Sequence, residues 1–155
     1  MDLVSRFLFP APPPSYSLNS FRGELVCVPR SLNPQTSSPE DFVPLLLLRY
    51  PSARFLVFFL HSNFEDLGRC YPFCKALCAE LGVHVLAVEY PGYGVCPGTR
   101  CDEHSVVECT NVAFRFVCNV LRWPPEHIIV LGRSIGTGPA VSIAFAHAID
   151  RSALG

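Results

Sequence analysis

The chain has 155 residues, of which 50% are apolar and only 16% are charged, and its formal net charge is -1. This length fits one domain, which we expect to span residues 1–155. Because the charges almost balance and no run of lysine or arginine occurs, a phosphate-tracking surface is excluded and no nucleic-acid partner is expected. The longest apolar runs are far shorter than the roughly 20 residues that cross a membrane as a helix.

Residues 1–18 form a proline-rich lead-in segment that contains FLFPAPPPSYS. The second residue is acidic and no small-residue cleavage pattern follows, so we expect no signal peptide and a cytoplasmic protein. Phe7, Leu8 and Phe9 would allow weak peripheral contact with a membrane surface. Packing of this segment on its own domain is the simpler alternative.

Without a signal peptide, the eight cysteines are expected to be reduced thiols that pack as small apolar side chains. Cys70, Cys74 and Cys78 repeat every four residues along one stripe of a predicted helix, where sulfurs lie one above another and do not converge on a metal. We therefore expect no metal site. Cys96 and Cys101 flank a loop, and pairing between them stays open.

Short strands separated by irregular segments are expected before Pro51, because prolines cluster in this part of the chain. The candidate strands are Leu25–Val28 and Leu45–Tyr50, joined by the polar surface connection SLNPQTSSPED.

Buried apolar runs alternate with helix-length segments after Pro51. The expected strands are Phe55–Leu60, Val83–Val88 and His127–Leu131. The expected helices run from about Glu65 to Leu81 with Gly82 as C-cap, from about Asp102 to Leu121, and onward from Ser134. This alternation predicts an α/β fold with a mostly parallel sheet and flanking helices. Ligand chemistry in such a sheet lies at the carboxyl ends of the strands, which here carry HSN, EYPGYG and GRSIG.

The sequence GRSIG is a G-x-S-x-G motif that follows a β-branched strand and opens a helix, which is the setting of a nucleophile elbow. Gly132 and Gly136 lack the Cβ atoms that would collide in so tight a turn. Ser134 is then expected to stand exposed at a helix N-terminus, where the NH of Ile135 can stabilise a developing oxyanion. Pro139 is unfavourable if the helix starts at Ile135, because it would remove a helical hydrogen bond.

Two alternatives use the same glycines. Gly132, Gly136 and Gly138 also fit the G-x-x-x-G-x-G pattern with which short-chain dehydrogenases seat a dinucleotide. That pattern belongs after the first strand of its fold, whereas three or more strands precede it here, so its position argues against a dinucleotide cofactor. A structural turn without chemistry is the other alternative.

Together these motifs resemble the N-terminal half of an α/β-hydrolase over about residues 10–146. The resemblance is greatest to the depalmitoylase-like α/β-hydrolase-domain-containing proteins, which share the proline-tyrosine lead-in, and to serine-aminopeptidase-type domains. It implies that Ser134 is the catalytic nucleophile and that the backbone NH groups of Asn63 and Ile135 form the oxyanion hole. By the same resemblance His61 braces the oxyanion loop and is not the catalytic base.

The resemblance implies a serine hydrolase that acts on carboxylic esters or thioesters, including protein depalmitoylation, without a metal or organic cofactor. Three features depart from the pattern. Ser62 replaces a glycine and would strain the oxyanion loop if that position needs a positive φ. Glu89 replaces a shorter aspartate. The first cysteine is Cys27, so the N-terminal cysteine cluster that anchors the depalmitoylases is not matched.

The acid and the histidine of a catalytic triad are missing from the expected places. In this fold they follow the serine, yet only 21 residues follow Ser134, so we expect a partial fold truncated after the elbow helix. The remaining candidates are expected to be structural or out of reach: His84, His104, His127, His147 and Asp150. A catalytically incomplete hydrolase-like fragment, with a binding role or none, is therefore the alternative function.

A fold truncated in this way would leave His127–Leu131 as an apolar edge strand. Such an edge is a template for pairing with another chain. We therefore expect self-association through this edge and marginal stability.

Overall fold

The computed structural model describes residues 9–31, 38, 40–98 and 101–152, and for residues 147–152 it describes the backbone alone. Phe7 and Leu8 lie outside the described residues, as does most of the connection SLNPQTSSPED. Phe9 is half-buried and packs against the apolar core, as in the simpler alternative for the lead-in segment.

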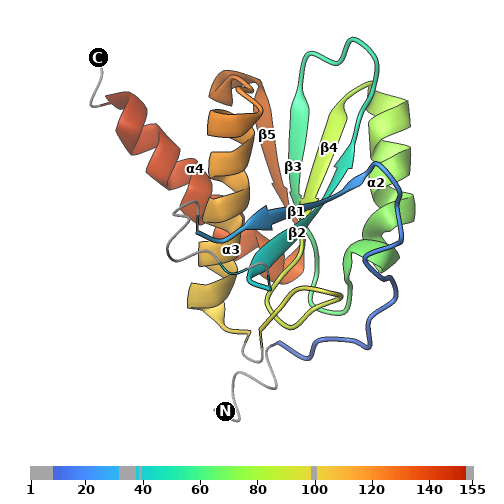
Figure 1. The fold of residues 1–155 in the computed structure, drawn as a ribbon. Coiled ribbons are helices and arrows are strands. Elements are labelled where there is room, and N and C mark those ends of the chain that lie inside the picture. Colours follow the sequence, from blue (N-terminus) through green and yellow to red (C-terminus); the bar gives the residue numbers. More distant parts are fainter. Residues whose placement is uncertain (1–8, 32–37, 39, 99–100, 153–155) are drawn as a thin grey trace.

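Five strands form one sheet in the order β1-β2-β4-β3-β5 (Figure 1). The strands are β1 (Leu25–Pro29), β2 (Phe42–Leu48), β3 (Leu56–Leu60), β4 (His84–Val88) and β5 (Ile128–Gly132). β3 runs parallel to both β4 and β5, whereas β2 runs antiparallel to β1 and β4. The predicted α/β fold is confirmed, with a sheet that is mixed because the first two strands form a hairpin at one side.

Within the described residues, three α-helices cover the sheet. They are α2 (Leu67–Leu81), α3 (Glu103–Arg115) and α4 (Thr137–Ser152). The predicted helix that ends at Leu121 is present as α3 followed by a π-helical turn, Phe116–Val120. Figure 1 shows α2 on one face of the sheet and α3 with α4 on the other, the arrangement that right-handed crossovers produce.

β2 begins three residues earlier than the sequence predicts, at Phe42, and it includes Pro44. Proline lacks an amide donor, so a proline in the sequence indicates the end of a strand or an edge strand. Here the carbonyl oxygen of Pro44 accepts a hydrogen bond from the backbone NH of Glu89 at 3.1 Å. The acceptor therefore still joins β2 to the neighbouring β4 segment where the donor is missing.

β3 is buried along its whole length because helices cover both of its faces. Leu56, Phe58 and Leu60 belong to the cluster under α3 and α4. Val57 and Phe59 belong to the cluster under α2. The alternation of side chains along a strand thus divides one apolar run between two cores.

The cysteine stripe of α2 packs into the second core, as the four-residue spacing predicts: Cys70 and Cys74 are fully buried and Cys78 nearly so. Asp66 caps the start of α2 by accepting a hydrogen bond from the backbone NH of Arg69. Gly82 ends the helix at φ 63°, the left-handed conformation that a C-cap glycine supplies. In the described part of the chain, no helix is both long and apolar enough to cross a membrane.

Among the described strands, β5 lies at the edge of the sheet and pairs with β3 alone. The side chain of Ile129 is 48% exposed on this strand, and Val141 and Phe145 of α4 are each 68% exposed. Apolar side chains beside unpaired backbone groups are the features that natural edge strands avoid. This edge is where we expect the chain to associate with itself.

Replacing Ile129 with lysine is predicted to reduce self-association at little cost in stability. A charge on an edge strand opposes pairing, and the half-exposed side chain loses little buried area. Sedimentation velocity across a concentration series measures the association, and urea unfolding measures the stability, whose midpoint we expect to be low for a domain of this size.

Substitution of an exposed residue far from the edge, Glu80→Lys on α2, serves as the control. A native chain that stays monomeric at all concentrations, or an Ile129→Lys variant that associates as strongly as the native chain, would contradict the assignment of the edge.

Candidate active site

Three loops meet at the carboxyl ends of β3, β4 and β5, the lower end of the sheet in Figure 1. The parallel register pairs Leu60 of β3 with Val88 of β4 and with Gly132 of β5. The loops that follow these residues therefore start side by side. They carry the sequences HSN, EYPGYG and RSIG, as the sequence predicts.

Ser134 occupies a strained backbone conformation directly after β5. Its φ is 54°, the left-handed region that costs a non-glycine residue about 1–2 kcal/mol. A 3-10 turn, Ser134–Gly136, follows, in which the NH of Gly136 donates to the carbonyl of Arg133 at 3.0 Å. The serine side chain is exposed, and among the described residues its hydroxyl makes no hydrogen bond.

The two glycines of the motif are required by close packing of backbone on backbone. A Cβ added to Gly136 would collide with the carbonyl of Leu60 and lie 2.9 Å from the carbonyl oxygen of His61. A Cβ added to Gly132 would lie 2.8 Å from the Cα of Thr137. The NH of Arg133 donates to the carbonyl of Leu60 at 2.9 Å. The turn is thus fixed against the end of β3, where the oxyanion loop is expected to begin.

Pro139 causes no break in the helix, because α4 begins at Thr137 and not at Ile135. Pro139 is then the third helical residue, where a backbone NH has no partner within the helix. The 3-10 turn before α4 is what shifts the start of the helix. Because of this shift, Pro139 does not cost the helix the hydrogen bond that the sequence led us to expect it would.

His61 is fully buried and both of its ring nitrogens are engaged. Nδ1 lies 2.9 Å from the carbonyl oxygen of Ser62, which can only accept, so Nδ1 donates there. Nε2 lies 2.9 Å from Oε1 of Glu89. Both ring nitrogens are thus occupied by partners other than Ser134, and the role of His61 stays a prediction.

Glu89 is a fully buried carboxylate that accepts hydrogen bonds from several segments. Besides His61, its donors are the hydroxyl of Tyr16 and the backbone NH of Leu67, each 2.9 Å from Oε2, and the backbone NH of Tyr90 at 3.3 Å. Burial and the negative charge of Glu89 raise the pKa of Tyr16 far above its usual value, so this hydroxyl stays protonated and donates. The sequence marks Glu89 as a departure from aspartate but does not reveal these partners.

Glu65 joins the loop after β3 to the serine turn. Its Oε2 accepts hydrogen bonds from the hydroxyl of Ser62 at 2.7 Å and from the backbone NH of Ser62 at 3.2 Å, and it forms an ion pair with Arg133. The guanidinium of Arg133 also lies over the rings of Phe59 and Phe73, at 5.6 and 5.0 Å from their centroids. We call Ser62, Glu65 and Arg133 the loop clamp.

Ser62 has no positive φ, so the expected strain of the oxyanion loop does not arise. The serine uses its hydroxyl in the loop clamp, a contact that a glycine could not make. Asn63 accepts a hydrogen bond at Oδ1 from the hydroxyl of Tyr93 at 2.7 Å, which ties the EYPGYG loop to the same site. Sequence reasoning missed Glu65 and Arg133, although their positions beside two motifs were a usable signal.

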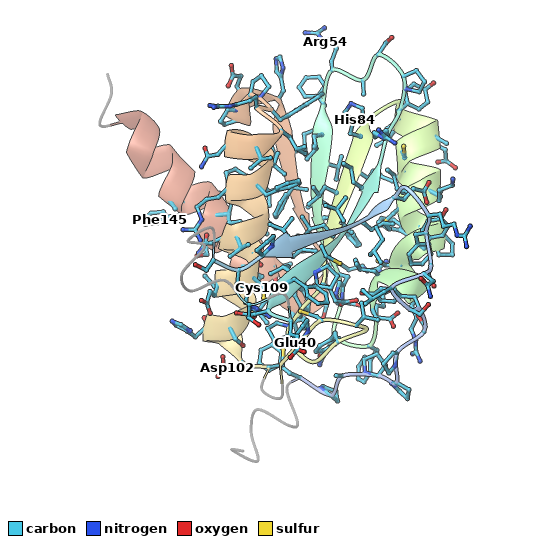
Figure 2. The ribbon with its side chains drawn as sticks, viewed as in Figure 1. Glu40, Arg54, His84, Asp102, Cys109 and Phe145 are labelled. Carbon is cyan, nitrogen blue, oxygen red and sulfur yellow. The ribbon has the colours of Figure 1, made fainter. Side chains whose placement is uncertain are left out.

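None of the other histidines whose side chains are described contacts Ser134. His84 accepts a hydrogen bond from the NH of Tyr50 at the amino end of β4, and Figure 2 shows it far from Asp102, which lies at the site end. His127 precedes β5 and His104 is exposed in the first turn of α3. The side chain of His147 lies outside the described residues, as does that of Asp150.

No protein-family model matches the sequence, but individual proteins are similar to it. Alpha/beta hydrolase domain-containing protein aho-3 of Caenorhabditis elegans is 28% identical over 158 aligned positions, which cover 92% of this chain and 47% of that protein. Alpha/beta hydrolase domain-containing protein 17C of Homo sapiens is 33% identical over 94 residues, 61% of this chain and 28% of that protein. The chain spans less than half the length of these relatives.

Solved structures with a similar fold include an esterase from Pyrobaculum calidifontis, which is 18% identical with a TM-score of 0.57 and is matched over 83% of this chain and 39% of its own. An alpha-beta serine hydrolase homologue from Coxiella burnetii is 16% identical with a TM-score of 0.59, over 85% of this chain and 60% of its own. At these identities the likeness shows a shared fold.

Glu65→Gln is predicted to lower stability in a pH-dependent way. Partial burial raises the pKa of Glu65, but hydrogen bonds from Ser62 and the ion pair with Arg133 outweigh burial, so the net pKa lies below its usual value of 4.5. The stabilisation is therefore present above that value and is lost as the pH falls through the lowered folded pKa. Urea unfolding should show a deficit of about 1 kcal/mol or less at pH 7 that shrinks below about pH 4.

The control is Glu80→Gln, which removes an exposed carboxylate of α2. A deficit for Glu65→Gln that stays constant from pH 7 to pH 3 would show that the charge of Glu65 does not stabilise the loop clamp.

Loss of the Glu89 carboxylate is predicted to cost far more. Glu89→Ala leaves buried hydrogen-bond donors without an acceptor. It should lower the free energy of unfolding by about 3–5 kcal/mol, enough to prevent folding of a marginal domain. Glu89→Gln keeps one acceptor and should cost about 1–3 kcal/mol. Urea unfolding checks both against Glu80→Ala, for which a change within about 0.5 kcal/mol is expected. A native midpoint for Glu89→Gln would contradict this assignment.

Proposed function

The chain belongs to the α/β-hydrolase superfamily and spans part of the length of its relatives, and from this premise we propose that it hydrolyses carboxylic esters or thioesters with Ser134 as nucleophile. The observation that carries the proposal is the backbone of Ser134. A non-glycine residue at φ 54°, exposed at a strand end and held between two obligatory glycines, is strained in the way typical of a nucleophile elbow.

The reaction proposed for this site forms a covalent acyl-enzyme. The Ser134 oxygen bonds to the acyl carbon, the bond from that carbon to the leaving oxygen or sulfur breaks, and the hydroxyl proton is finally delivered to the leaving group. Water then attacks the acyl carbon, releases the carboxylic acid and restores the serine hydroxyl. The backbone NH groups of Asn63 and Ile135 are the proposed donors to the oxyanion of each step.

Two features support this assignment of the oxyanion hole. The loop clamp ties the loop that carries Asn63 to the turn that carries Ile135, so both backbones are fixed relative to each other. His61 and Glu89 hold the start of the same loop from beneath. Preorganised donors of this kind stabilise a developing charge without rearrangement. His61 is thus proposed as a positioning residue.

The acyl group on a protein cysteine is the substrate class that we propose within this reaction, as in protein depalmitoylation. The support is the resemblance of the motifs and of the proline-tyrosine lead-in to the depalmitoylase-like branch. Tyr16 of that lead-in bonds to Glu89 under the site, and Ser15 bonds to Asp66 through its backbone NH at 2.6 Å. The lead-in is therefore part of the site's support.

A second candidate function is a hydrolase-like domain that binds without catalysis. The observation that favours it is that no described histidine contacts Ser134, whereas serine attack needs a base to take the hydroxyl proton. In that case the half-exposed edge strand β5 offers the binding surface.

Labelling with a fluorophosphonate separates the two candidates. The Ser134 oxygen should displace fluoride from phosphorus, giving a stable adduct on the native chain and none on Ser134→Ala. The adduct is read by intact-mass spectrometry and located by peptide mapping. Ser134→Gly is the folding control, because glycine adopts a φ of 54° without strain and should raise the urea midpoint.

A chain that is folded by circular dichroism yet remains unlabelled would overturn the catalytic proposal for this chain. It would favour the binding function instead.

A further inference from the structure

A pocket of about 410 Å³ lies beside the serine turn, between the amino-terminal ends of α3 and α4. Its volume lies in the range typical of small-molecule sites, roughly 300–1,000 Å³. Three segments distant in sequence meet there. The walls comprise Phe9 of the lead-in, Val106 of α3, and Ile135, Gly138 and Pro139 of the turn and α4.

Most of the described residues that line this pocket are apolar, and several of them are continuous with the core. Val106 is only 2% exposed, and Phe9 and Ile135 both pack against the same buried cluster. Gly138 leaves the wall of α4 without a side chain, and a Cβ added there would meet nothing within 4 Å. A hydrocarbon chain would therefore find apolar contact on several sides.

The charged side chains among the described lining residues are acidic. Asp102 and Glu103 line it at the start of α3, and Asp102 already caps that helix by accepting from the NH of Ser105 at 2.9 Å. Among the described lining residues there is no lysine or arginine. Two carboxylates offset the positive end of α3 and repel a bound anion. The pocket chemistry thus favours an uncharged chain over a fatty-acid carboxylate or a phosphate.

We propose that this pocket binds the uncharged acyl chain of the substrate and sets its preferred length. Ile135 lines the pocket and directly follows Ser134, so the pocket lies next to the serine turn and can receive a chain whose carbonyl carbon is at Ser134. The inference rests on the proposed function, since that function supplies the acyl substrate. The lead-in then has a second role, because Phe9 forms part of the pocket wall.

Binding can be measured without catalysis in a Ser134→Ala background. The probe is the methyl ester of 11-dansylaminoundecanoic acid, followed by its fluorescence, with the free acid as its charged counterpart. We expect the ester to bind about tenfold more tightly than the acid. Methyl hexanoate, octanoate and decanoate should displace the ester with affinities that rise by up to about fourfold per methylene.

Gly138→Leu tests the location of the chain. Leucine fills the pocket from α4, has room at its Cβ, and has a higher helix propensity than glycine. The variant should stay folded and lose at least about tenfold in affinity for the dansyl ester. Ser142→Leu, which adds the same side chain at an exposed position of α4, is the matched control and should bind as the parent does. Phe9→Ala, which removes the side chain that the lead-in contributes to the wall, should also weaken binding.

Absence of ester binding by the folded Ser134→Ala chain would overturn the proposal, as would equal binding by the folded Gly138→Leu variant. Tighter binding of the free acid than of the ester would overturn the uncharged-chain assignment. The fluorophosphonate result is independent of these outcomes, because the binding assay contains no nucleophile. Ester binding by a chain that the fluorophosphonate does not label would retain the pocket and reject the proposed catalysis.

Discussion

The buried carboxylate of Glu89 receives hydrogen bonds from the lead-in, from the loop after β3, and from the first residue of α2. A charge that has left water is tolerated only where donors replace its hydration, so these segments must lie where they do for the fold to form. His61 is held by this carboxylate, and the hydroxyl of Tyr90 donates to the carbonyl of His61 at 2.9 Å. The carboxyl ends of β3 and β4 are thereby held together by contacts within the chain itself.

The serine turn depends on these contacts of Glu89 and His61. Gly136 lies against the carbonyls of Leu60 and His61 so closely that no side chain fits between them. The strain of a positive φ at Ser134 is sustained because these contacts leave the turn no other path. The loop clamp adds an electrostatic connection on the outer side, where Arg133 bridges from the turn to Glu65. A rigid turn and a rigid loop are what a preorganised oxyanion site requires.

The sheet edge formed by β5 has the opposite character. In the part of the chain that the structure describes, β5 pairs with β3 alone, and α4 leaves the large apolar side chains of Val141 and Phe145 in solvent. The well-packed site therefore sits next to an edge strand of the sheet. Stability and function draw on the same strand, because β5 both carries the serine turn and forms the open edge.

Sequence alone determined the α/β class, most strand and helix positions, the cysteine stripe and the G-x-S-x-G turn, because these follow from local periodicity and from the geometry of glycine. It also predicted that HSN and GRSIG would meet, because parallel strands end at one edge. Tertiary structure decided what those patterns cannot express: that Glu89 is a shared acceptor, that Ser62 bonds to Glu65, and that α4 starts late enough to accommodate Pro139. Each depends on side chains or backbone groups brought together by packing, which a one-dimensional pattern does not encode.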